Sequence, residues 1–415
     1  MTLSQDVTLS QLDARRVIQT VGSAGQPPIW GAGLFTDGFE STLKLLDDEF
    51  FKDYLSHGGS VFKLVVGHYG GGKTHFLYLL RELAWRQDYV VAYVSLTPEE
   101  TPFHRLDLVY RAIAGSVAYP PADRIPNPGL MALLKTVVAR WRKQTPDMTP
   151  EVMESMARDA VSELDSLNYQ RAMSKALVAL AAGDDETAMN LVQWLAAEGY
   201  ERSVHRGHGI LSGIDRSTAL TAIRCLARFV RQAGFTGLVV LFDEAERLPS
   251  LSGRQKEFML SNLRELIDES ARGTVPGMFM AYAIPDFRFF DGKTGVYEAV
   301  KQRTSTMFGF YNPSGVSIKL EDLVTDLLPH LRSIGTKLWR IYEIAYDCEL
   351  PEVAALEAVD VISRAVESQR FGDVSYRRLF VQSAVRAFEE LRRKSDVVVD
   401  REWADNIVDQ FLGGN

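Results

Sequence analysis

The stretch that decides the fold is VFKLVVGHYGGGKTHFLYLL, residues 61–80. Its first six residues are apolar except for Lys63, which predicts a buried strand of a parallel sheet. The next eight residues, Gly67–Thr74, fit the pattern G-x-x-x-x-G-K-[ST] at every fixed position. Behind them, apolar side chains recur at helical spacing: Phe76, Leu79, Leu80 and Leu83. The order of strand, glycine loop and helix is the context in which this pattern binds a triphosphate.

The residue types of this loop suit a phosphate ligand. Glycines allow successive backbone N–H groups to point at the phosphates, and the helix that follows adds its positive dipole end. We expect Lys73 to reach the β- and γ-phosphates and the Thr74 hydroxyl to ligate Mg²⁺. The alternative is a glycine-rich turn with a chance Gly-Lys-Thr, which the flanking strand and helix disfavour. We therefore assign the nucleotide site to Gly67, His68, Tyr69, Gly70, Gly71, Gly72, Lys73 and Thr74, with His75 beside them.

Composition limits the class of protein. A chain of 415 residues can bury a large core and is expected to form more than one domain. It has no signal-peptide pattern and no apolar run of the roughly 18 residues that a membrane span needs. The two cysteines, Cys225 and Cys348, lie in helical patterns, which indicates buried thiols in a reducing, cytoplasmic setting. The net charge of -8 argues against nonspecific coating of nucleic acid but leaves room for one local basic surface.

The pattern of elements predicts an α/β protein with a parallel sheet. We expect buried strands at 61–66, 89–96, 237–244, 278–284 and 315–320. The segments are an N-terminal helix and linker (1–28), the first part of a nucleotide-binding core (29–119), a helical insertion (120–213), the second part of the core (214–320) and a C-terminal helical lid (321–415).

Asp243 and Glu244 end the third apolar strand and form the second half of the predicted site. A carboxylate at Asp243 can hold Mg²⁺, and Glu244 would orient or deprotonate the attacking water. A solvated turn is the alternative, which the upstream loop disfavours. The run Asp243–Glu246 also resembles one motif of DExD helicases, but the remaining helicase motifs are absent, so helicase activity in this chain is excluded.

Two arginines are candidates for contact with the γ-phosphate. Arg303 ends a helix just before the fifth strand and could reach the nucleotide of a neighbouring subunit. The alternative is a cation that matches the dipole at a helix C-terminus. Arg377, at the start of a lid helix, could touch the nucleotide of its own chain, or it could lie on a solvated helix start.

Two further basic segments are less specific. The loop 200–209, YERSVHRGHG, could touch DNA or a protein partner, or it could be ordinary surface. No cysteine or carboxylate cluster lies near its histidines, so a zinc site is not expected. Residues 391–394, LRRK, are interpreted as the exposed end of a helix.

With these features in this order, the chain resembles an AAA+ ATPase, and within that class the initiator and loader types and the signal-transducing STAND ATPases. More narrowly, it is similar to the P-loop ATP-binding proteins of BREX phage-defence systems, the BrxD type. The resemblance covers about Trp30 to Leu320. Three stretches carry it: 67–77 (GHYGGGKTHFL), 207–211 (GHGIL) and 234–249 (GFTGLVVLFDEAERLP).

One departure from that class concerns the residue that senses the γ-phosphate. Such proteins often have a small polar residue after the fourth strand, whereas this chain has Ala283-Ile284-Pro285-Asp286. Either Asp286 or Tyr282 replaces the sensor, or hydrolysis is slow.

The resemblance implies an ATP- and Mg²⁺-dependent, cytoplasmic homo-oligomer of AAA+ architecture. Its work would be to hydrolyse ATP, to assemble on DNA in a phage-defence system, and to deliver or regulate a partner helicase or nuclease. The alternative is a STAND-like switch that binds ATP and signals with little hydrolysis.

We predict that Lys73→Ala abolishes tight ATP binding and leaves the fold intact. The lysine offers the only side-chain positive charge within Gly67–Thr74 apart from His68 if protonated, and it faces a ligand with about four negative charges. Calorimetry of the wild type and the variant measures the effect, and equal ATP affinities would refute the assignment of the loop.

Overall fold

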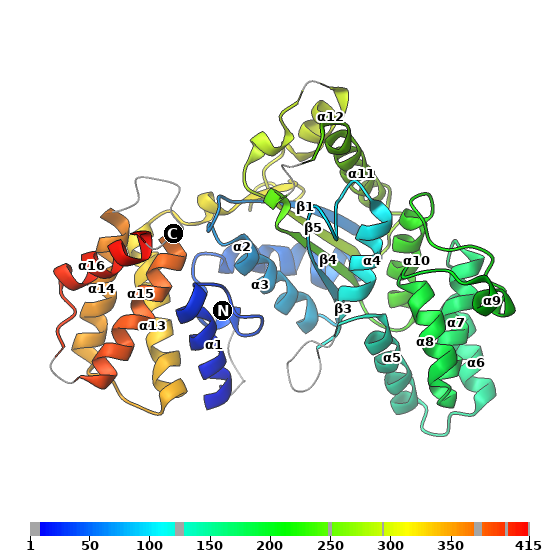
Figure 1. The fold of residues 1–415 in the computed structure, drawn as a ribbon, viewed down its shortest axis with the longest axis horizontal. Coiled ribbons are helices and arrows are strands. Elements are labelled where there is room, and N and C mark those ends of the chain that lie inside the picture. Colours follow the sequence, from blue (N-terminus) through cyan, green and yellow to red (C-terminus); the bar gives the residue numbers. More distant parts are fainter. Residues whose placement is uncertain are drawn as a thin grey trace. The chain divides into compact units, whose positions relative to one another are not determined.

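The computed structural model describes residues 9–120, 128–247, 251–292, 294–368, 376–394 and 397–413 and has a mixed α/β fold (Figure 1). Six strands form one sheet in the order β3-β2-β4-β5-β1-β6. The chain divides into two compact units. The bundle unit comprises Met1–Leu45, Val65–Glu82 and Lys319–Asn415, and the sheet unit comprises Leu46–Leu64 and Leu83–Ile318.

The five strands that the sequence predicts are confirmed. They are β1 (Ser60–Val66), β2 (Tyr89–Ser95), β4 (Gly237–Asp243), β5 (Met278–Ile284) and β6 (Ser317–Lys319). Every residue of β1, β4 and β5 is buried, which explains why these strands are continuous apolar runs. Strand β4 pairs in parallel with β2, Ser95 opposite Asp243, and with β5, Leu238 opposite Met278.

The sequence did not predict β3 (Val117–Ala118), which pairs antiparallel with β2. A two-residue strand is too short to show a period of two, so the pattern could not reveal it. The sheet is therefore mostly parallel with one antiparallel edge.

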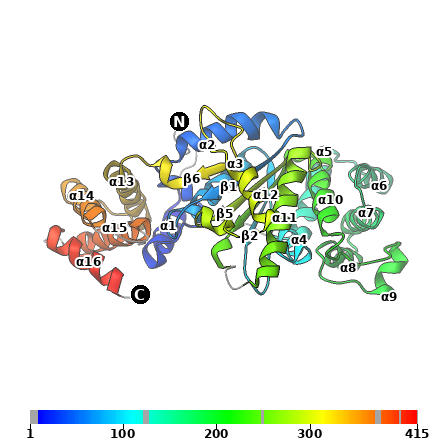
Figure 2. The same cartoon turned by 90° about the horizontal axis from the view of Figure 1, so that it is seen from above.

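Helices α4 and α10 pack on the sheet unit's strands β2 and β4. Among the insertion helices, α5 lies beside α10, and α6, α7 and α9 lie farther from the strands than α10 does (Figure 2). This unit also contains a π-helix (Asp47–Tyr54) and the α-helices α4 (Leu106–Ser116), α5 (Leu130–Gln144), α6 (Pro150–Asp159), α7 (Leu167–Ala182), α8 (Asp185–Leu195), α9 (Arg202–His205), α10 (Ala219–Gln232), α11 (Gly253–Arg272) and α12 (Gly295–Thr304).

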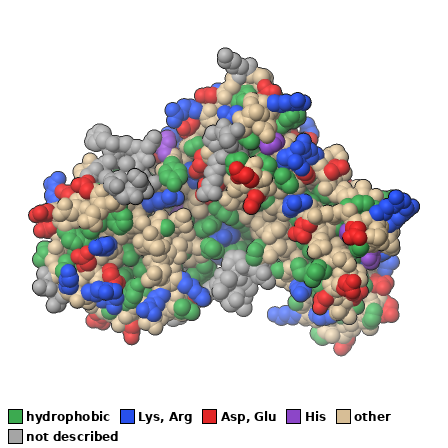
Figure 3. Space-filling view, in the orientation of Figure 1, with side chains coloured by type: hydrophobic (Ala, Val, Ile, Leu, Met, Phe, Trp, Pro, Cys, Tyr) green, Lys and Arg blue, Asp and Glu red, His purple; other side chains and the backbone are tan. Residues whose placement is uncertain are grey.

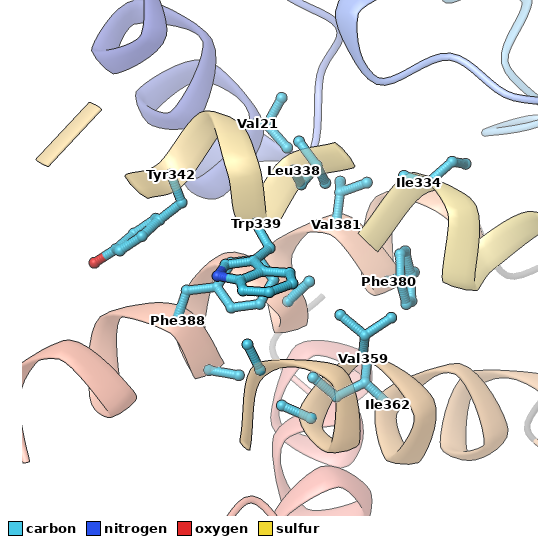
Figure 4. Close-up of a cluster of buried hydrophobic side chains, with 14 of the residues drawn as sticks. Val21, Ile334, Leu338, Trp339, Tyr342, Val359, Ile362, Phe380, Val381 and Phe388 are labelled. Carbon is cyan, nitrogen blue, oxygen red and sulfur yellow. The ribbon is translucent and has the colours of Figure 1, made fainter. Parts of the chain in front are cut away.

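The bundle unit has its own hydrophobic core. Trp339 and Tyr342 of α13 lie among side chains of α14 and α15, including Ile362 and Phe388 (Figure 4). Helix α1, from the opposite end of the sequence, packs against α13 and α15 and contributes Val21. The other α-helices of the described residues are α1 (Gln11–Ala24), α2 (Glu40–Leu46), α3 (Lys73–Arg86), α13 (Leu327–Tyr346), α14 (Glu352–Ser368), α15 (Tyr376–Arg393) and α16 (Arg401–Gly413).

No helix in the described part of the chain is both long and apolar enough to cross a membrane.

One buried charge interrupts the apolar β1 strand. Lys63 is 1% exposed, and its Nζ donates to the backbone oxygens of Pro313 at 3.1 Å and Gly315 at 2.5 Å. The rings of Phe50 and Phe308 each lie with their centroid 4.5 Å from the same nitrogen. Burial lowers the pKa of Lys63 to about 7. The lysine thus fixes the loop before β6 to the sheet.

Lys63 gives the folded protein a measurable pH signature. Between about pH 7 and its ordinary pKa of 10.5, the unfolded chain holds a proton on this lysine that the folded chain has released. The free energy of unfolding should therefore rise with pH across this window. We expect Lys63→Met to lose this rise, measured by urea denaturation at several pH values.

Lys143→Met, at an exposed position of α5, serves as the matched control and should keep the rise. Identical pH slopes for the wild type and Lys63→Met would contradict the assignment.

Candidate nucleotide site

The glycine loop between β1 and α3 adopts a backbone that other residues would strain. Gly70 has φ +71° and Gly72 has φ +93°. The Gly71 N–H donates to the His68 oxygen at 2.9 Å, and a Cβ on Gly71 would lie 2.9 Å from that same oxygen. These glycines are therefore required by the turn itself.

Lys73 begins α3 and is only 5% exposed. Its Nζ donates to the backbone oxygens of Gly67 at 3.0 Å and His68 at 3.3 Å. The ammonium is thus held inside the curve of the loop, where it can meet an anion bound by the loop backbone.

Residues from the C-terminal part of the chain also hold the loop. The Glu321 carboxylate accepts from the His68 N–H at 2.7 Å. Arg378 of α15 lies over the exposed Tyr69 ring, 5.1 Å from its centroid, and donates to its hydroxyl at 3.3 Å. The bundle unit therefore contains both the glycine loop and the helices that contact it.

Arg377 of α15 makes the most informative of these contacts. Its Nη1 donates to the Gly71 oxygen, and its guanidinium lies 5.6 Å from the centroid of the Phe39 ring. The Nη2 atom is buried and has no hydrogen-bond partner among the described residues. Burial lowers the pKa of this arginine. A half-buried cation with a buried, unused donor at the loop fits an anionic ligand.

His330 and Asp37 form a chain of hydrogen bonds that positions the Arg377 guanidinium. His330 of α13 is 4% exposed, its Nδ1 lies 2.9 Å from Asp37 Oδ2, and its Nε2 accepts from Arg377 Nε at 3.4 Å. Burial and the charge of Arg377 lower the pKa of His330. The neutral ring donates from Nδ1 to Asp37 and accepts at Nε2, so the contact with Arg377 depends on the ring staying uncharged.

The side chain of His75 does not turn towards the loop. Its Nε2 lies 2.7 Å from Thr36 Oγ1, and its ring centroid lies 5.3 Å from that of Phe35. Burial, and then the charges of Arg377 and His330, lower the pKa of His75 to about 3. A nucleotide role for His75 stays a prediction, and its backbone N–H is the group available for it.

In the sheet unit, the end of β4 holds Asp243 in a fixed orientation. Asp243 is 1% exposed, accepts from the Tyr93 hydroxyl at 2.6 Å on Oδ2, and accepts from the Glu244 N–H at 2.8 Å on Oδ1. Glu244 has φ +63°, which is uncommon for a residue with a side chain. Strained backbone of this kind concentrates at functional sites.

Arg303 lies at the end of α12, as the sequence predicts, but it has a partner in its own chain. Its Nε and Nη2 donate to the two carboxylate oxygens of Asp268 at 2.6 and 3.2 Å, and Nη1 donates to the Ala299 oxygen at 2.9 Å. Its contact with a neighbouring subunit stays a prediction, and it requires Asp268 to be exchanged for a phosphate.

Of the two candidates for the γ-phosphate sensor, Asp286 is paired with a neighbouring residue, whereas Tyr282 is buried and its hydroxyl has no hydrogen-bond partner among the described residues. Asp286 accepts from the backbone and guanidinium of Arg288. Tyr282 is fully buried against the rings of Phe103 and Phe242, and burial raises its pKa.

The basic loop 200–209 is partly internal. His205 is 6% exposed and its ring stacks on Tyr200 at 5.5 Å between centroids, whereas Arg202 and Arg206 are exposed. Across the described ranges, no group of three or more His, Cys, Asp or Glu side chains is arranged to hold a metal ion.

Sequence reasoning missed four residues that hold the predicted ones: Asp37, Tyr93, Glu321 and His330. None of them belongs to a local motif. Each contacts its partner across a long stretch of chain, so only the folded structure brings them together.

The class that the fold defines is a mostly parallel α/β protein with a glycine-rich loop after a buried strand. The comparison with known protein families is more specific than the fold class. The model of the BREX system ATP-binding protein BrxC/D family matches residues 9–406, so this chain belongs to that phage-defence family. The match extends beyond Trp30–Leu320, the range of the sequence resemblance, into α1 and the C-terminal bundle. A search of the curated proteins finds no match.

Arg377→Met should separate ligand binding from stability. It removes a half-buried cation and its hydrogen bond to the Gly71 oxygen, so we expect a small loss of about 0.5–1.5 kcal/mol in the free energy of unfolding. ATP affinity should fall about 10- to 100-fold, because a hydrogen bond to a charged group contributes about 1.5–3 kcal/mol. Calorimetry and urea denaturation measure the two effects.

Arg378→Met is the matched control, because Arg378 is adjacent but contacts only the exposed Tyr69 side chain of the loop. We expect it to keep ATP affinity within about threefold of wild type. Unchanged affinity in Arg377→Met would argue against a ligand at this guanidinium.

Proposed function

We propose that this protein is an AAA+-type P-loop ATPase of a BREX phage-defence system, and that ATP binds at Gly67–Thr74. The observation that carries the proposal is the buried Nη2 atom of Arg377, which lies beside the glycine loop and lacks a partner within the described structure. A buried, unsatisfied cationic donor is costly, and a phosphate oxygen would satisfy it. The family supports ATP as the ligand.

Hard oxygen donors for Mg²⁺ are available in the Thr74 hydroxyl and the Asp243 carboxylate. Tyr93 and the Glu244 N–H already orient that carboxylate, as hydrogen-bonding groups around metal ligands do. The ion would neutralise charge on the phosphates. The chain's own part is to hold the triphosphate by the loop amides, Lys73 and Arg377.

Glu244 is the proposed general base. It follows the oriented Asp243, and its left-handed backbone turns the chain sharply at the strand end. A carboxylate at this position can accept the proton of an attacking water.

The partners that we propose are DNA, a helicase or other protein of the same defence system, and further copies of this chain. The rival function is a STAND-like switch with little hydrolysis. Two observations favour it: Asp286 is paired with Arg288, and Tyr282 is enclosed by rings. A steady-state ATPase assay with and without DNA separates the two. Turnover that DNA stimulates supports the ATPase, and tight ATP binding without turnover in either condition supports the switch.

Glu244→Gln should keep ATP binding and lower the hydrolysis rate by about 100-fold or more, because the amide cannot accept the proton. Equilibrium binding and phosphate release measure the two properties. Wild-type turnover in the variant would exclude Glu244 as the base and leave Asp286 as the next candidate.

Subunit mixing tests whether Arg303 acts on a neighbouring subunit. Arg303→Ala and Glu244→Gln chains should each be inactive alone and regain part of the activity when mixed, since some interfaces then combine an intact Glu244 with an intact Arg303. Asp268→Ala, which frees Arg303, should remain active. Absence of rescue in a mixture shown by light scattering to co-assemble would rule out the shared site.

A further inference from the structure

A groove of about 610 Å³ runs along the bundle unit between α1, the end of α13 and the second half of α15. Its arginines come from two distant parts of the chain, Arg15 from α1 and Arg386, Arg392 and Arg393 from α15. Figure 3 shows Lys and Arg side chains recurring over the lower part of this unit. The groove uses none of the residues that hold the glycine loop.

The arginines of the groove outnumber its carboxylates. Arg392 and Arg393 share the single carboxylate of Glu389, at 2.8 and 2.5 Å. Glu389 also accepts from the Tyr342 hydroxyl, and these hydrogen bonds lower its pKa to about 2, although burial opposes them. That carboxylate therefore stays ionised and fully used.

The other two arginines leave the positive charge in excess. Arg386 pairs with Glu390 at 3.2 Å and remains 54% exposed, so the pair is weak. Arg15 has no carboxylate partner among the described residues, and its guanidinium lies 5.2 Å from the centroid of the Tyr346 ring. A local excess of positive charge in a chain of net charge -8 marks a site for an anionic partner.

The shape of the groove favours a nucleic-acid strand over a free small anion. The Tyr346 ring has two guanidiniums against it, from Arg15 and from Arg392 at 4.5 Å, and its hydroxyl accepts from Gln19 at 3.2 Å. Planar guanidiniums offer stacking surfaces to bases, and the arginine forks suit phosphate oxygens. The open groove allows a chain to enter and leave.

We propose that this groove binds the sugar-phosphate backbone of nucleic acid, through Arg15, Arg386, Arg392 and Arg393. The proposal rests on the proposed function for DNA as the partner, and it adds the place of binding. That place is separate from the nucleotide site, so it can be tested without ATP turnover.

The test is the affinity of the full chain for a short fluorescent DNA, single-stranded and duplex, measured by anisotropy over a series of salt concentrations. Arg15→Gln with Arg386→Gln should weaken binding about tenfold or more and make the salt dependence shallower. The slope of log K against log salt should fall by about 0.7–0.9 for each phosphate that the variant no longer neutralises. Calorimetry with ATP checks that the nucleotide site is intact.

The matched control is Arg364→Gln with Arg401→Gln. It removes the same charge from two exposed arginines of α14 and α16 that do not line the groove. The control should bind DNA like wild type. Equal weakening in both variants, or no weakening in the groove variant, would overturn the groove as the site.

Competition assays and DNA binding by the wild type distinguish a failure of the groove assignment from a failure of the proposed function. Competition by poly-glutamate as effective as competition by unlabelled DNA would overturn nucleic acid in favour of an acidic protein segment. DNA binding by the wild type that the groove variant retains would overturn the groove alone. A wild type that binds ATP but no DNA at any salt concentration would overturn both the groove and DNA as a partner in the proposed function.

Discussion

The glycine loop has few side chains that could fix its conformation, so other residues of the bundle unit must hold it in place. Residues 67–72 offer backbone groups and few side chains, so charged residues elsewhere must fix their positions. Lys73 binds two loop oxygens from the first turn of α3, Arg377 binds the Gly71 oxygen from α15, and Glu321 binds the His68 N–H. A ligand at the loop therefore competes with, or adds to, contacts made by the C-terminal helices.

This arrangement gives a physical route from a ligand to the bundle. Arg377 is supported by His330 of α13, and His330 by Asp37 just before α2. If the Arg377 guanidinium moves towards a phosphate, either its hydrogen bond to the neutral His330 ring lengthens or the ring moves with it. In the proposed function, ATP at the loop would therefore be linked to the positions of α13 and α15 through these hydrogen bonds. That coupling serves an ATPase cycle and a switch equally well, so turnover decides between them.

Two buried charged residues in the sheet unit, Lys63 and Asp243, have specific hydrogen-bond partners. Lys63 is surrounded by two carbonyl oxygens and two ring faces, and Asp243 by a tyrosine hydroxyl and a backbone N–H. The cost of an unpaired buried charge explains why each has specific partners. Arg377 Nη2 is the exception at the loop, and this is why it points to a ligand.

The sequence by itself determined five of the six strands, the glycine loop and the strand-end pair Asp243-Glu244. Burial on both faces makes each strand a continuous apolar run, and the loop is a local backbone shape that needs glycine at fixed spacing. Only the tertiary structure decided that α1 packs with α13 and α15, that Arg303 pairs with Asp268, and that His330 supports Arg377. These contacts join distant segments, and neither hydrophobic periodicity nor a motif records which distant side chain will complete a hydrogen bond.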